Sequence, residues 1–521
     1  MVRTAGRPLP WHFILPALLA LAGVLLPMVY LLLRALQADP QTLQEIVFRE
    51  RNLRLLGNTL ALMLGVLLVC TLLALPLAWL TTRSNLRGKR FLSLLLTLPL
   101  AVPGYVGAFA LLGATGPGGL LETLLHLNWP RPQGYWGALG VLTLFIYPYL
   151  FLNLRAALLG LDPSLEEAAR SLGYRGIAVV LKVVLPQLRP ALYAGWLLIG
   201  LHVLGDFGVV SLMRFETFSY AIYIQYSASF DRVYAAWLSL MLIVLTLSLL
   251  WLEARALLGL NLSRVGQGSA RRQTQTPLGR WTPLAYGFAA IPIAGALVIP
   301  LATVGYWTVG IVAQQTGLSD LLDALWNTLQ ASAPAALVAT SLALPLAYLG
   351  VRYPSRLSRA LERTAYLGYA VPPLAFALAL IFFSLRGLPF LYQTLGLLIM
   401  AYALYFMAEA IGPIRSALYQ ASPRLEEAAR GLGYRPAQAF MRATFPLLRR
   451  GLLSSMALVF LSSVKELPLT FLLAPVGYDT LATRIWSYTS EAVYAQAAPY
   501  ALIIVVFSAC FIGLLLTQER R

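Results

Sequence analysis

The sequence predicts an all-α, polytopic membrane protein with twelve transmembrane helices, arranged as two parallel six-helix repeats. Hydrophobic residues make up 59% of the 521 residues and charged residues only 12%, which is more apolar surface than a soluble core can bury. Apolar runs of about 20 residues recur along the chain, and each is long enough for a helix to cross a hydrocarbon layer of about 30 Å. These runs lack the alternation of barrel strands, so helices must satisfy their backbone groups. The third observation is an internal duplication, described below.

The apolar runs place the spans in order along the chain. In the first half we expect them at residues 11–34, 58–82, 92–113, 136–160, 191–213 and 234–257. In the second half we expect them at 283–312, 327–350, 364–386, 392–413, 451–473 and 496–517. The first run follows Arg3 and Arg7, is longer than a signal-peptide core and lacks a small-residue cleavage site, so we interpret it as a retained helix.

The distribution of charge indicates the topology. The chain carries 39 Lys and Arg against 21 Asp and Glu, a formal net charge of +18. If the N-terminus is cytoplasmic, most of the basic residues fall in cytoplasmic loops or at cytoplasmic helix ends. The excess charge therefore indicates membrane orientation, with both termini in the cytoplasm, and we expect no nucleic-acid partner. A polar stretch at 258–282 reads as a flexible cytoplasmic linker between a first domain, 1–257, and a second, 283–521.

The two halves share short sequences at a constant offset. Asn58-Thr59-Leu60 recurs as Asn327-Thr328-Leu329, and Pro103 recurs as Pro372. An even number of helices per repeat gives parallel halves related by an axis along the membrane normal, so a substrate is expected between them. Prolines in the second and third helices are expected either to bend these helices or to shape their packing. They are Pro76, Pro99, Pro103, Pro345, Pro372 and Pro373.

A longer duplication lies between the fourth and fifth helices of each half, at 162–190 and 422–450. Each copy opens with an N-cap residue, Asp162 or Ser422, followed by proline at the first helical position. A pair of glutamates then lies near the positive end of the helix dipole. Gly173 and Gly433 can adopt the positive φ that ends such a helix. A basic segment follows, which we expect to close at Pro186 or Pro446 before the next span.

This duplicated segment resembles the signature of binding-protein-dependent ABC importer permeases: Glu-Ala-Ala, three residues, Gly, nine residues, then an Ile-x-Leu-Pro-like ending. The first copy has Glu167, Ala168, Ala169, Gly173, Val183, Leu185 and Pro186; the second has Glu427, Ala428, Ala429, Gly433, Ala443, Phe445 and Pro446. The resemblance implies the type I importer permease fold and a coupling helix that docks in a groove of the ATPase. Glu166 and Glu426 are included in the docking loops. The alternative is an ordinary amphipathic connector.

The resemblance also implies partners. The chain has only three lysines, Lys89, Lys182 and Lys465, and none completes a phosphate-binding loop, so the ATPase is expected to be a separate protein. Two docking loops imply two copies of it, together with one external substrate-binding protein, in a bacterial plasma (inner) membrane. Cys70 and Cys510 fall in apolar runs and offer no disulfide framework. We expect no cofactor, no resident metal and no catalytic residue.

The substrate is narrowed by a second resemblance. The fusion of two halves in one chain resembles the arrangement of the ferric-iron permeases and, less closely, that of the thiamine permeases. Segments 98–112, 204–223 and 464–486 also resemble the iron group. Ferric iron is the substrate that this resemblance implies, and thiamine or another small solute is the alternative.

Three acidic residues are candidates for the translocation pathway. Asp206 and Glu466 occupy equivalent positions near the outer part of the fifth helix of each half. An ionisable group costs about 2.5 to 3.5 kcal/mol within a span, so it usually faces a cavity or a partner. Carboxylate and phenolate oxygens suit a hard cation. Glu409, in the tenth helix, is the third candidate.

Several tyrosines and two neighbouring groups accompany these acids. Tyr149 is equivalent to Glu409, and Tyr147, Tyr402 and Tyr405 are nearby in sequence. A structural role remains open for the two equivalent acids, because Glu466 follows Lys465 and Asp206 lies one turn after His202.

Two other classes of protein remain open. An ion-coupled secondary transporter fits parallel repeats and carboxylates in the membrane, but it leaves the paired cytoplasmic loops without a role. A membrane-embedded enzyme would need a nucleophile with a base or a metal triad. The three histidines, His12, His126 and His202, form no such group in the sequence.

Overall fold

The computed structural model describes residues 11–37, 49–161, 163–174, 177–227, 231–257, 275–313 and 318–518. Within these ranges the secondary structure is helical, apart from one isolated parallel β-bridge between Ser84 and Thr276. The predicted all-α fold is confirmed.

The first half contains the long helices that were expected and several short ones between them. They are α1 (Trp11–Ala35), α3 (Glu50–Arg83), α4 (Lys89–Thr97), α5 (Gly104–Ala114), α6 (Leu120–Leu125), α7 (Gly134–Gly160), α8 (Pro163–Ser171), α9 (Ile177–Val179), α10 (Leu185–Gly205), α11 (Gly208–Leu212), α12 (Phe218–Ser227) and α13 (Arg232–Leu257). A 3-10 turn, Leu98–Ala101, follows α4, and a π-helical turn, Val180–Val184, joins α9 to α10.

The second half repeats this order. Its helices are α14 (Thr282–Ile293), α15 (Ile299–Ala313), α16 (Leu318–Arg352), α17 (Arg356–Ala370), α18 (Pro373–Gly387), α19 (Leu395–Gln420), α20 (Pro423–Gly431), α21 (Pro436–Ala439), α22 (Phe445–Val464), α23 (Pro468–Leu473), α24 (Leu481–Ser490) and α25 (Tyr494–Gln518). Short 3-10 turns lie at Gly279–Trp281 and Pro389–Leu391, and π-helical turns at Ala294–Val298 and Phe440–Thr444.

The long helices match the predicted spans. Among the described residues, nine helices are long and apolar enough to cross a membrane, and two bent helix pairs raise the number of spans to eleven. The bent pairs are the predicted third spans: the chain turns by 97° before Gly104 and by 104° before Pro373. Pro103 and Pro372 lie at these turns. A shorter apolar helix, Tyr494–Cys510, occupies the place of the predicted last span.

The predicted bounds of the fifth span are wrong in both halves. Helix α10 ends at Gly205 and α22 at Val464, whereas the apolar runs predicted 191–213 and 451–473. The chain then breaks at Asp206 or Glu466 and forms the short helices α11 and α23. Hydropathy does not reveal this break, because the residues of the short helices are as apolar as the span itself.

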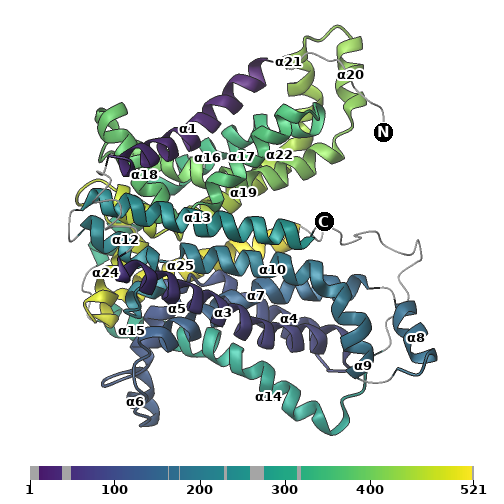
Figure 1. Ribbon diagram of the computed structural model, residues 1–521, viewed down its shortest axis with the longest axis vertical. Helices are drawn as coiled ribbons and strands as arrows, with labels where there is room; N and C mark the ends of the chain where they lie inside the picture. Colours follow the sequence, from purple (N-terminus) through teal and green to yellow (C-terminus); the bar gives the residue numbers. More distant parts are fainter. Residues whose placement is uncertain are drawn as a thin grey trace.

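The first helix of each half packs on the other half. Helix α1 contacts α16, α17 and α18 of the second half, while α15 contacts α5 of the first half as well as α25 of its own half. Figure 1 shows α1 lying along the second-half helices. The contacts are close: Phe13 stacks on Tyr348 with ring centroids 4.3 Å apart, and Trp307 donates to the carbonyl of Gly113 at 3.4 Å. The two sequence repeats are therefore interlocked.

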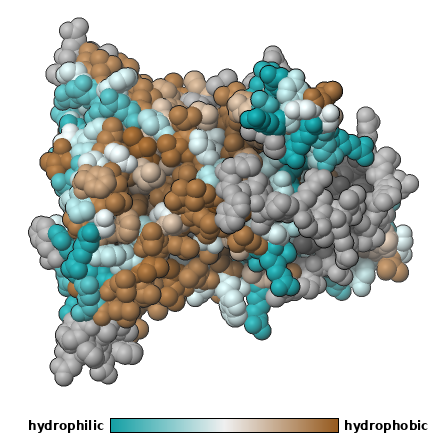
Figure 2. Space-filling model, turned by 90° about the horizontal axis from the view of Figure 1, so that it is seen from above, coloured by the Kyte–Doolittle hydropathy of each residue, from teal (hydrophilic) through white to brown (hydrophobic). Residues whose placement is uncertain are grey.

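The outer surface fits a lipid environment. Figure 2 shows a broad hydrophobic surface between hydrophilic side chains gathered toward the two ends of the molecule. Leu72, on α3, is 63% exposed, and Val309, on α15, is 72% exposed. A soluble protein rarely leaves such large apolar side chains exposed together. Lipid is the solvent that this belt requires.

Part of the predicted linker contacts the first half. Residues 258–274 lie outside the described residues, whereas 275–282 pack beside the end of α3. The backbone N–H of Thr276 donates to the carbonyl of Arg83 at 2.8 Å, and the N–H of Leu278 donates to the Asn85 side chain at 3.0 Å.

Candidate functional site

The two copies of the duplicated segment each begin with the short helix that the sequence predicted. Helix α8 runs over Pro163–Ser171 and α20 over Pro423–Gly431. The hydroxyl of Ser422 accepts from the backbone N–H of Arg424 at 3.4 Å, which confirms Ser422 as the N-cap. The equivalent prediction for Asp162 lies outside the described residues. Figure 1 shows α8 and α20 well apart at the same end of the molecule.

A left-handed glycine ends each of these helices. Gly173 and Gly433 both have φ of +88°, a conformation that other residues rarely adopt. The next residue closes the turn: the N–H of Tyr174 donates to the carbonyl of Ala169 at 3.0 Å, and that of Tyr434 to Ala429 at 3.2 Å. This is the Schellman pattern, and it confirms the predicted turn in both copies.

The same tyrosines lie against a cation of the following segment. Lys182 lies over the ring of Tyr174, with its Nζ 4.7 Å from the ring centroid. Arg442 lies over Tyr434, with its Cζ 4.5 Å from the centroid. At exposed sites such cation–π contacts contribute about 0.5 to 1 kcal/mol, and here they connect each turn to the segment that follows it. These two pairs were not predicted from the sequence, although both members recur at a constant offset.

The prediction that Pro186 and Pro446 close the segment before the span is wrong. The helix continues through both prolines, because a π-helical turn precedes each of them. The N–H of Leu185 donates to the carbonyl of Val180, and that of Phe445 to Phe440, five residues back. A proline inside an α-helix lacks an N–H and clashes with the carbonyl four residues back. The wider π turn accommodates the ring without ending the helix.

The first glutamate of each pair fastens its helix to the membrane domain. Glu166 forms an ion pair with Arg83 at 3.0 Å, and Arg83 also donates to the carbonyl of Leu158 at 3.2 Å. Arg352, the equivalent of Arg83, donates to the carbonyl of Ala421 at 2.6 Å. The C-terminal ends of α3 and α16 are thus tied to α8 and to the segment that enters α20.

Glu426 has hydrogen-bond partners on three different elements. Its carboxylate accepts from the Tyr348 hydroxyl at 3.1 Å, from Arg430 at 3.1 Å and from the Thr444 hydroxyl at 3.2 Å. Its side chain is only 8% exposed. These contacts join α20 to α16 and to the π turn before α22.

The outward face of each helix remains open for a partner. Glu167 and Ala168, with Glu427 and Ala428, are exposed, whereas Ala169 packs inward. Leu172 is 79% exposed and Leu432, its equivalent, 80%. A leucine this exposed in both copies indicates an apolar contact with another protein. These two leucines were not among the residues predicted from the sequence.

We expect loss of the Glu426 carboxylate to loosen α20. Glu426→Ala leaves the Tyr348 and Thr444 hydroxyls without their acceptor, which costs about 1 to 3 kcal/mol. Hydrogen exchange of the α20 backbone amides should therefore become faster, while exchange in α8 stays unchanged. Arg424→Ala, on the exposed face of the same helix, is the matched control. Equal exchange in the two variants would contradict the anchoring role.

A central cavity lies between the halves. It has a volume of about 270 Å³ and receives all three acidic residues that the sequence singled out: Asp206, Glu409 and Glu466. Tyr149 and Tyr405 also line it. Tyr147 and Tyr402 do not: the Tyr147 hydroxyl donates to the carbonyl of Leu96 at 2.8 Å, and the Tyr402 hydroxyl is bonded to Thr470. These two tyrosines have structural roles.

Asp206 and Glu466 sit where the fifth spans break. Asp206 Oδ1 accepts from the N–H groups of Val209 at 3.0 Å and Val210 at 3.1 Å. Glu466 Oε1 accepts from the N–H of Leu469 at 3.0 Å. Each carboxylate therefore begins a short helix with one oxygen and leaves further acceptor capacity for the cavity. In the described residues neither acid has an ion pair within 4 Å.

The rest of the lining differs between the halves. In the second half, the Ser462 hydroxyl donates to Glu409 at 2.7 Å. The equivalent positions in the first half hold His202 and Tyr149, whose Nε2 and hydroxyl lie 3.4 Å apart. Lys465 lines the second-half side only, and Gly205 takes its place in the first. The Ser462–Glu409 hydrogen bond of the second half therefore corresponds to a contact between His202 and Tyr149 in the first half.

Four rings separate this cavity from the end of the molecule that carries α12 and α24. Phe207, which lines the cavity, lies 5.8 Å from Trp486 and 4.9 Å from Tyr223 between ring centroids. Phe471 lies 4.6 Å from Trp486. This ring cluster comes from both halves, and its Phe207 contributes to the lining of the cavity. Among the described residues, no three His, Cys, Asp or Glu side chains stand together as a metal site.

The comparison with known proteins agrees with this geometry. The family of binding-protein-dependent transport system inner membrane components matches residues 59–256 and again residues 335–521. The chain belongs to this family. It is the transmembrane permease of an ABC importer, a multi-pass protein of an inner-membrane transport system, and it functions with an ATPase and a substrate-binding protein. The permease is a transport component and not an enzyme, as the sequence predicted.

The relatives of the permease include single and double permeases. It is 35% identical over 505 residues to the Fe(3+)-transport system permease protein FbpB 2 of Haemophilus influenzae, covering 96% of this chain and 97% of that protein. It is 23% identical over 492 residues to the ferric transport system permease protein FbpB of Actinobacillus pleuropneumoniae, covering 90% and 71%. The sulfate transport system permease protein CysW of Escherichia coli matches 46% of this chain over 88% of its own length, at 29% identity. The permease thus combines two such halves in one chain.

Proposed function

We propose that the permease carries ferric iron from an external binding protein into the cytoplasm by alternating access. The observation that supports this most is the central cavity, where Asp206, Glu409 and Glu466 from both halves face one space. Two relatives that share most of the chain are named as ferric or Fe(3+) permeases.

The chemistry of the cavity suits a hard cation. Its lining offers three carboxylates, four tyrosine hydroxyls and a single lysine, and oxygen ligands are those that hard cations prefer. Two of the carboxylates already accept from backbone N–H groups, so the cavity provides weak, shared contacts for a passing ion. Such a site favours passage over retention.

The ATPases act on the permease through two docking helices, α8 and α20. In this proposal one copy of the ATPase binds at α8 and a second copy binds at α20. Each docking loop consists of the Glu-Glu-Ala-Ala run, the following glycine and the proline at the start of the fifth span. ATP binding draws the two ATPases together, and the anchors at Glu166 and Glu426 transmit this motion to α3 and α16. The ring cluster then opens toward one docked binding protein. Hydrolysis returns the cavity to the cytoplasmic side.

This mechanism requires both docking helices, and both termini, to be cytoplasmic, with residues 1–257 and 283–521 as the two permease domains. A single cysteine at Ser171, which is exposed on α8, tests the orientation. We expect an impermeant thiol reagent to label Ser171→Cys in inside-out vesicles and not in intact cells. Labelling in intact cells would reject the proposed topology.

The substrate is tested by reconstitution. The permease, its ATPase and its binding protein in proteoliposomes should take up radiolabelled ferric iron when ATP is present, and should not take up labelled thiamine. Uptake of thiamine without iron would overturn the iron assignment and leave the transporter class intact. Uptake driven by an ion gradient without ATP would instead indicate a secondary transporter.

A further inference from the structure

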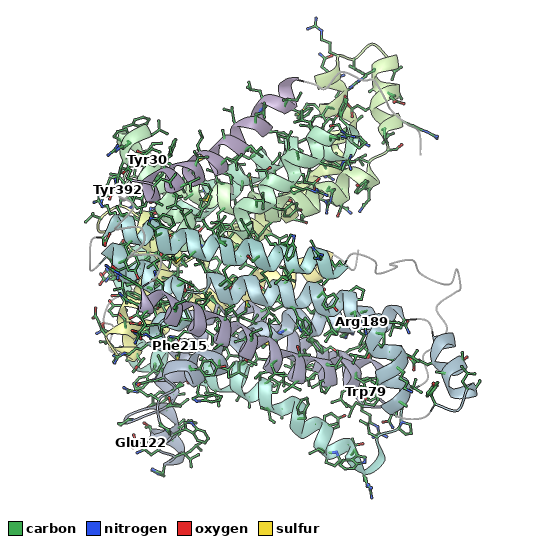
Figure 3. The ribbon with its side chains drawn as sticks, viewed as in Figure 1. Tyr30, Trp79, Glu122, Arg189, Phe215 and Tyr392 are labelled. Carbon is green, nitrogen blue, oxygen red and sulfur yellow. The ribbon has the colours of Figure 1, made fainter. Side chains whose placement is uncertain are left out.

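A second cavity opens at the end of the molecule opposite to the docking helices. It has a volume of about 240 Å³ and is lined from four segments: α5, the loop before α7, the residues from α11 to α12, and the region of α24 and α25. Figure 1 places α6, α12 and α24 at this end, and Figure 3 shows Phe215, which follows the lining residue Arg214, near the same end. The ring cluster separates it from the central cavity, since Tyr223 and Trp486 belong to its lining.

The charge of this outer cavity is opposite to that of the central one. Arg131 and Arg214 line it, together with Gln133, Tyr220 and Ser490, and no carboxylate is part of the lining. In the part of the chain that the structure describes, neither arginine has an ion pair within 4 Å. The acids near these arginines in sequence have other partners: Glu216 pairs with Arg51, and Glu122 accepts from the N–H of Gly118.

Arg131 is held in place before any ligand arrives. Its guanidinium donates to the carbonyls of Thr115 at 3.4 Å and Pro117 at 3.3 Å, and lies 5.0 Å above the ring of Tyr494. It also packs on Gly116, where an added Cβ would come within 2.6 Å of the arginine side chain. A guanidinium has five N–H donors in a planar fork, so donors remain for another acceptor.

The backbone of the lining is strained at two points. Arg214 has φ of +54° and Ala492 has φ of +62°, a region that residues other than glycine, asparagine and aspartate seldom occupy. Both residues end a helix: the N–H of Phe215 donates to the carbonyl of Val210 at 2.9 Å, and that of Val493 donates to Tyr488 at 2.8 Å, which is the Schellman pattern after α11 and α24. These two caps place the backbone of Arg214 and Ala492 at the cavity that Arg131 also lines.

We propose that this outer cavity binds an oxyanion of the phosphate or carboxylate class between Arg131 and Arg214. Paired guanidinium groups recognise such anions by charge-assisted, bidentate hydrogen bonds. The volume is sufficient for roughly eight waters at about 30 Å³ each, enough for one small oxyanion with part of its hydration. The anion occupies the outer side of the ring cluster, while the acidic cavity lies on its inner side.

Inorganic phosphate is the probe that tests this proposal. Calorimetric titration of the permease in nanodiscs should give saturable binding, weakened about tenfold by Arg131→Gln or Arg214→Gln and abolished in the double variant. Arg484→Gln is the matched control, because this arginine on the same outer region is already paired with Asp479 at 2.9 Å. Unchanged thermal unfolding would show that the variants are folded.

The alternatives have distinct results. Absence of saturable binding by the native permease, or equal binding by the double variant, would overturn the proposal. Two sources of the anion are separated by a second titration, in which the importer's own binding protein is added at saturating phosphate. Weakened docking identifies an acidic side chain of that protein as the occupant, and unchanged docking identifies a dissolved ion. The readout is equilibrium binding, so failure of the ferric-iron assignment would not affect it.

Discussion

ATP-driven uptake should fall by about tenfold or more in the double variant Gly173→Val, Gly433→Val, while ATP hydrolysis continues. Both glycines have φ of +88°, and a non-glycine residue pays about 1 to 2 kcal/mol in this region, with β-branched residues least able to adopt it. An added Cβ meets nothing within 4 Å at either position, so the effect comes from the backbone and not from a clash. Uptake and hydrolysis measured in the same proteoliposomes would show the uncoupling.

Two matched variants isolate the cause. Asparagine tolerates the left-handed region better than valine, so Gly173→Asn, Gly433→Asn should retain more uptake. Gly431→Val places the same side chain in α20 at a glycine without a positive φ and should have little effect. If the valine and asparagine variants transported equally, the left-handed turn would not be the element that matters for coupling.

Ferric-iron uptake should also fall by about tenfold when the two equivalent acids of the central cavity become amides. Asp206→Asn and Glu466→Gln keep an oxygen that can accept from Val209 and Leu469, so the short helices α11 and α23 should persist. What is lost is the negative charge offered to a hard cation. Initial uptake rates at saturating ATP measure this directly.

The control for these amides lies on the outer surface. Glu216 is half-exposed and pairs loosely with Arg51 at 3.9 Å, so Glu216→Gln removes an acid without touching the cavity. The Glu216→Gln variant should transport ferric iron at the native rate. In all three variants, ATP hydrolysis should remain coupled to docking of the binding protein. Normal iron uptake by the Asp206, Glu466 double variant would assign the two carboxylates to helix breaking alone.

Much of the fold could be predicted from local patterns. The positions of most spans follow from apolar runs, and Gly173 and Gly433 predict the turn because positive φ is a property of the residue itself. Ser422-Pro423 likewise predicts the start of α20, since capping depends on neighbours in sequence. Because these local features recur in both halves, the duplication also predicts that they form a two-fold arrangement.

The remaining features depend on contacts between distant segments. The exchange of α1 and α15 between halves leaves no trace in hydropathy, because a lipid-facing helix is apolar whichever bundle it contacts. The breaks at Asp206 and Glu466 were missed because the apolar run continues past them. The passage of the helix through Pro186 depends on a π turn, which the rule that proline ends a helix does not include. Arg131 and Arg214 meet only through tertiary structure.

In the proposed mechanism, the two docking helices approach each other when ATP binds. Ser171 and Gly431 are equivalent, exposed positions on α8 and α20, so spin labels at Ser171→Cys and Gly431→Cys report their separation. Cys510 is exposed and is first replaced by serine, whereas Cys70 is buried. In the reconstituted complex, electron–electron double resonance should show a shorter distance between the labels with bound ATP than without nucleotide. An unchanged distance in a complex that still hydrolyses ATP would contradict the mechanism.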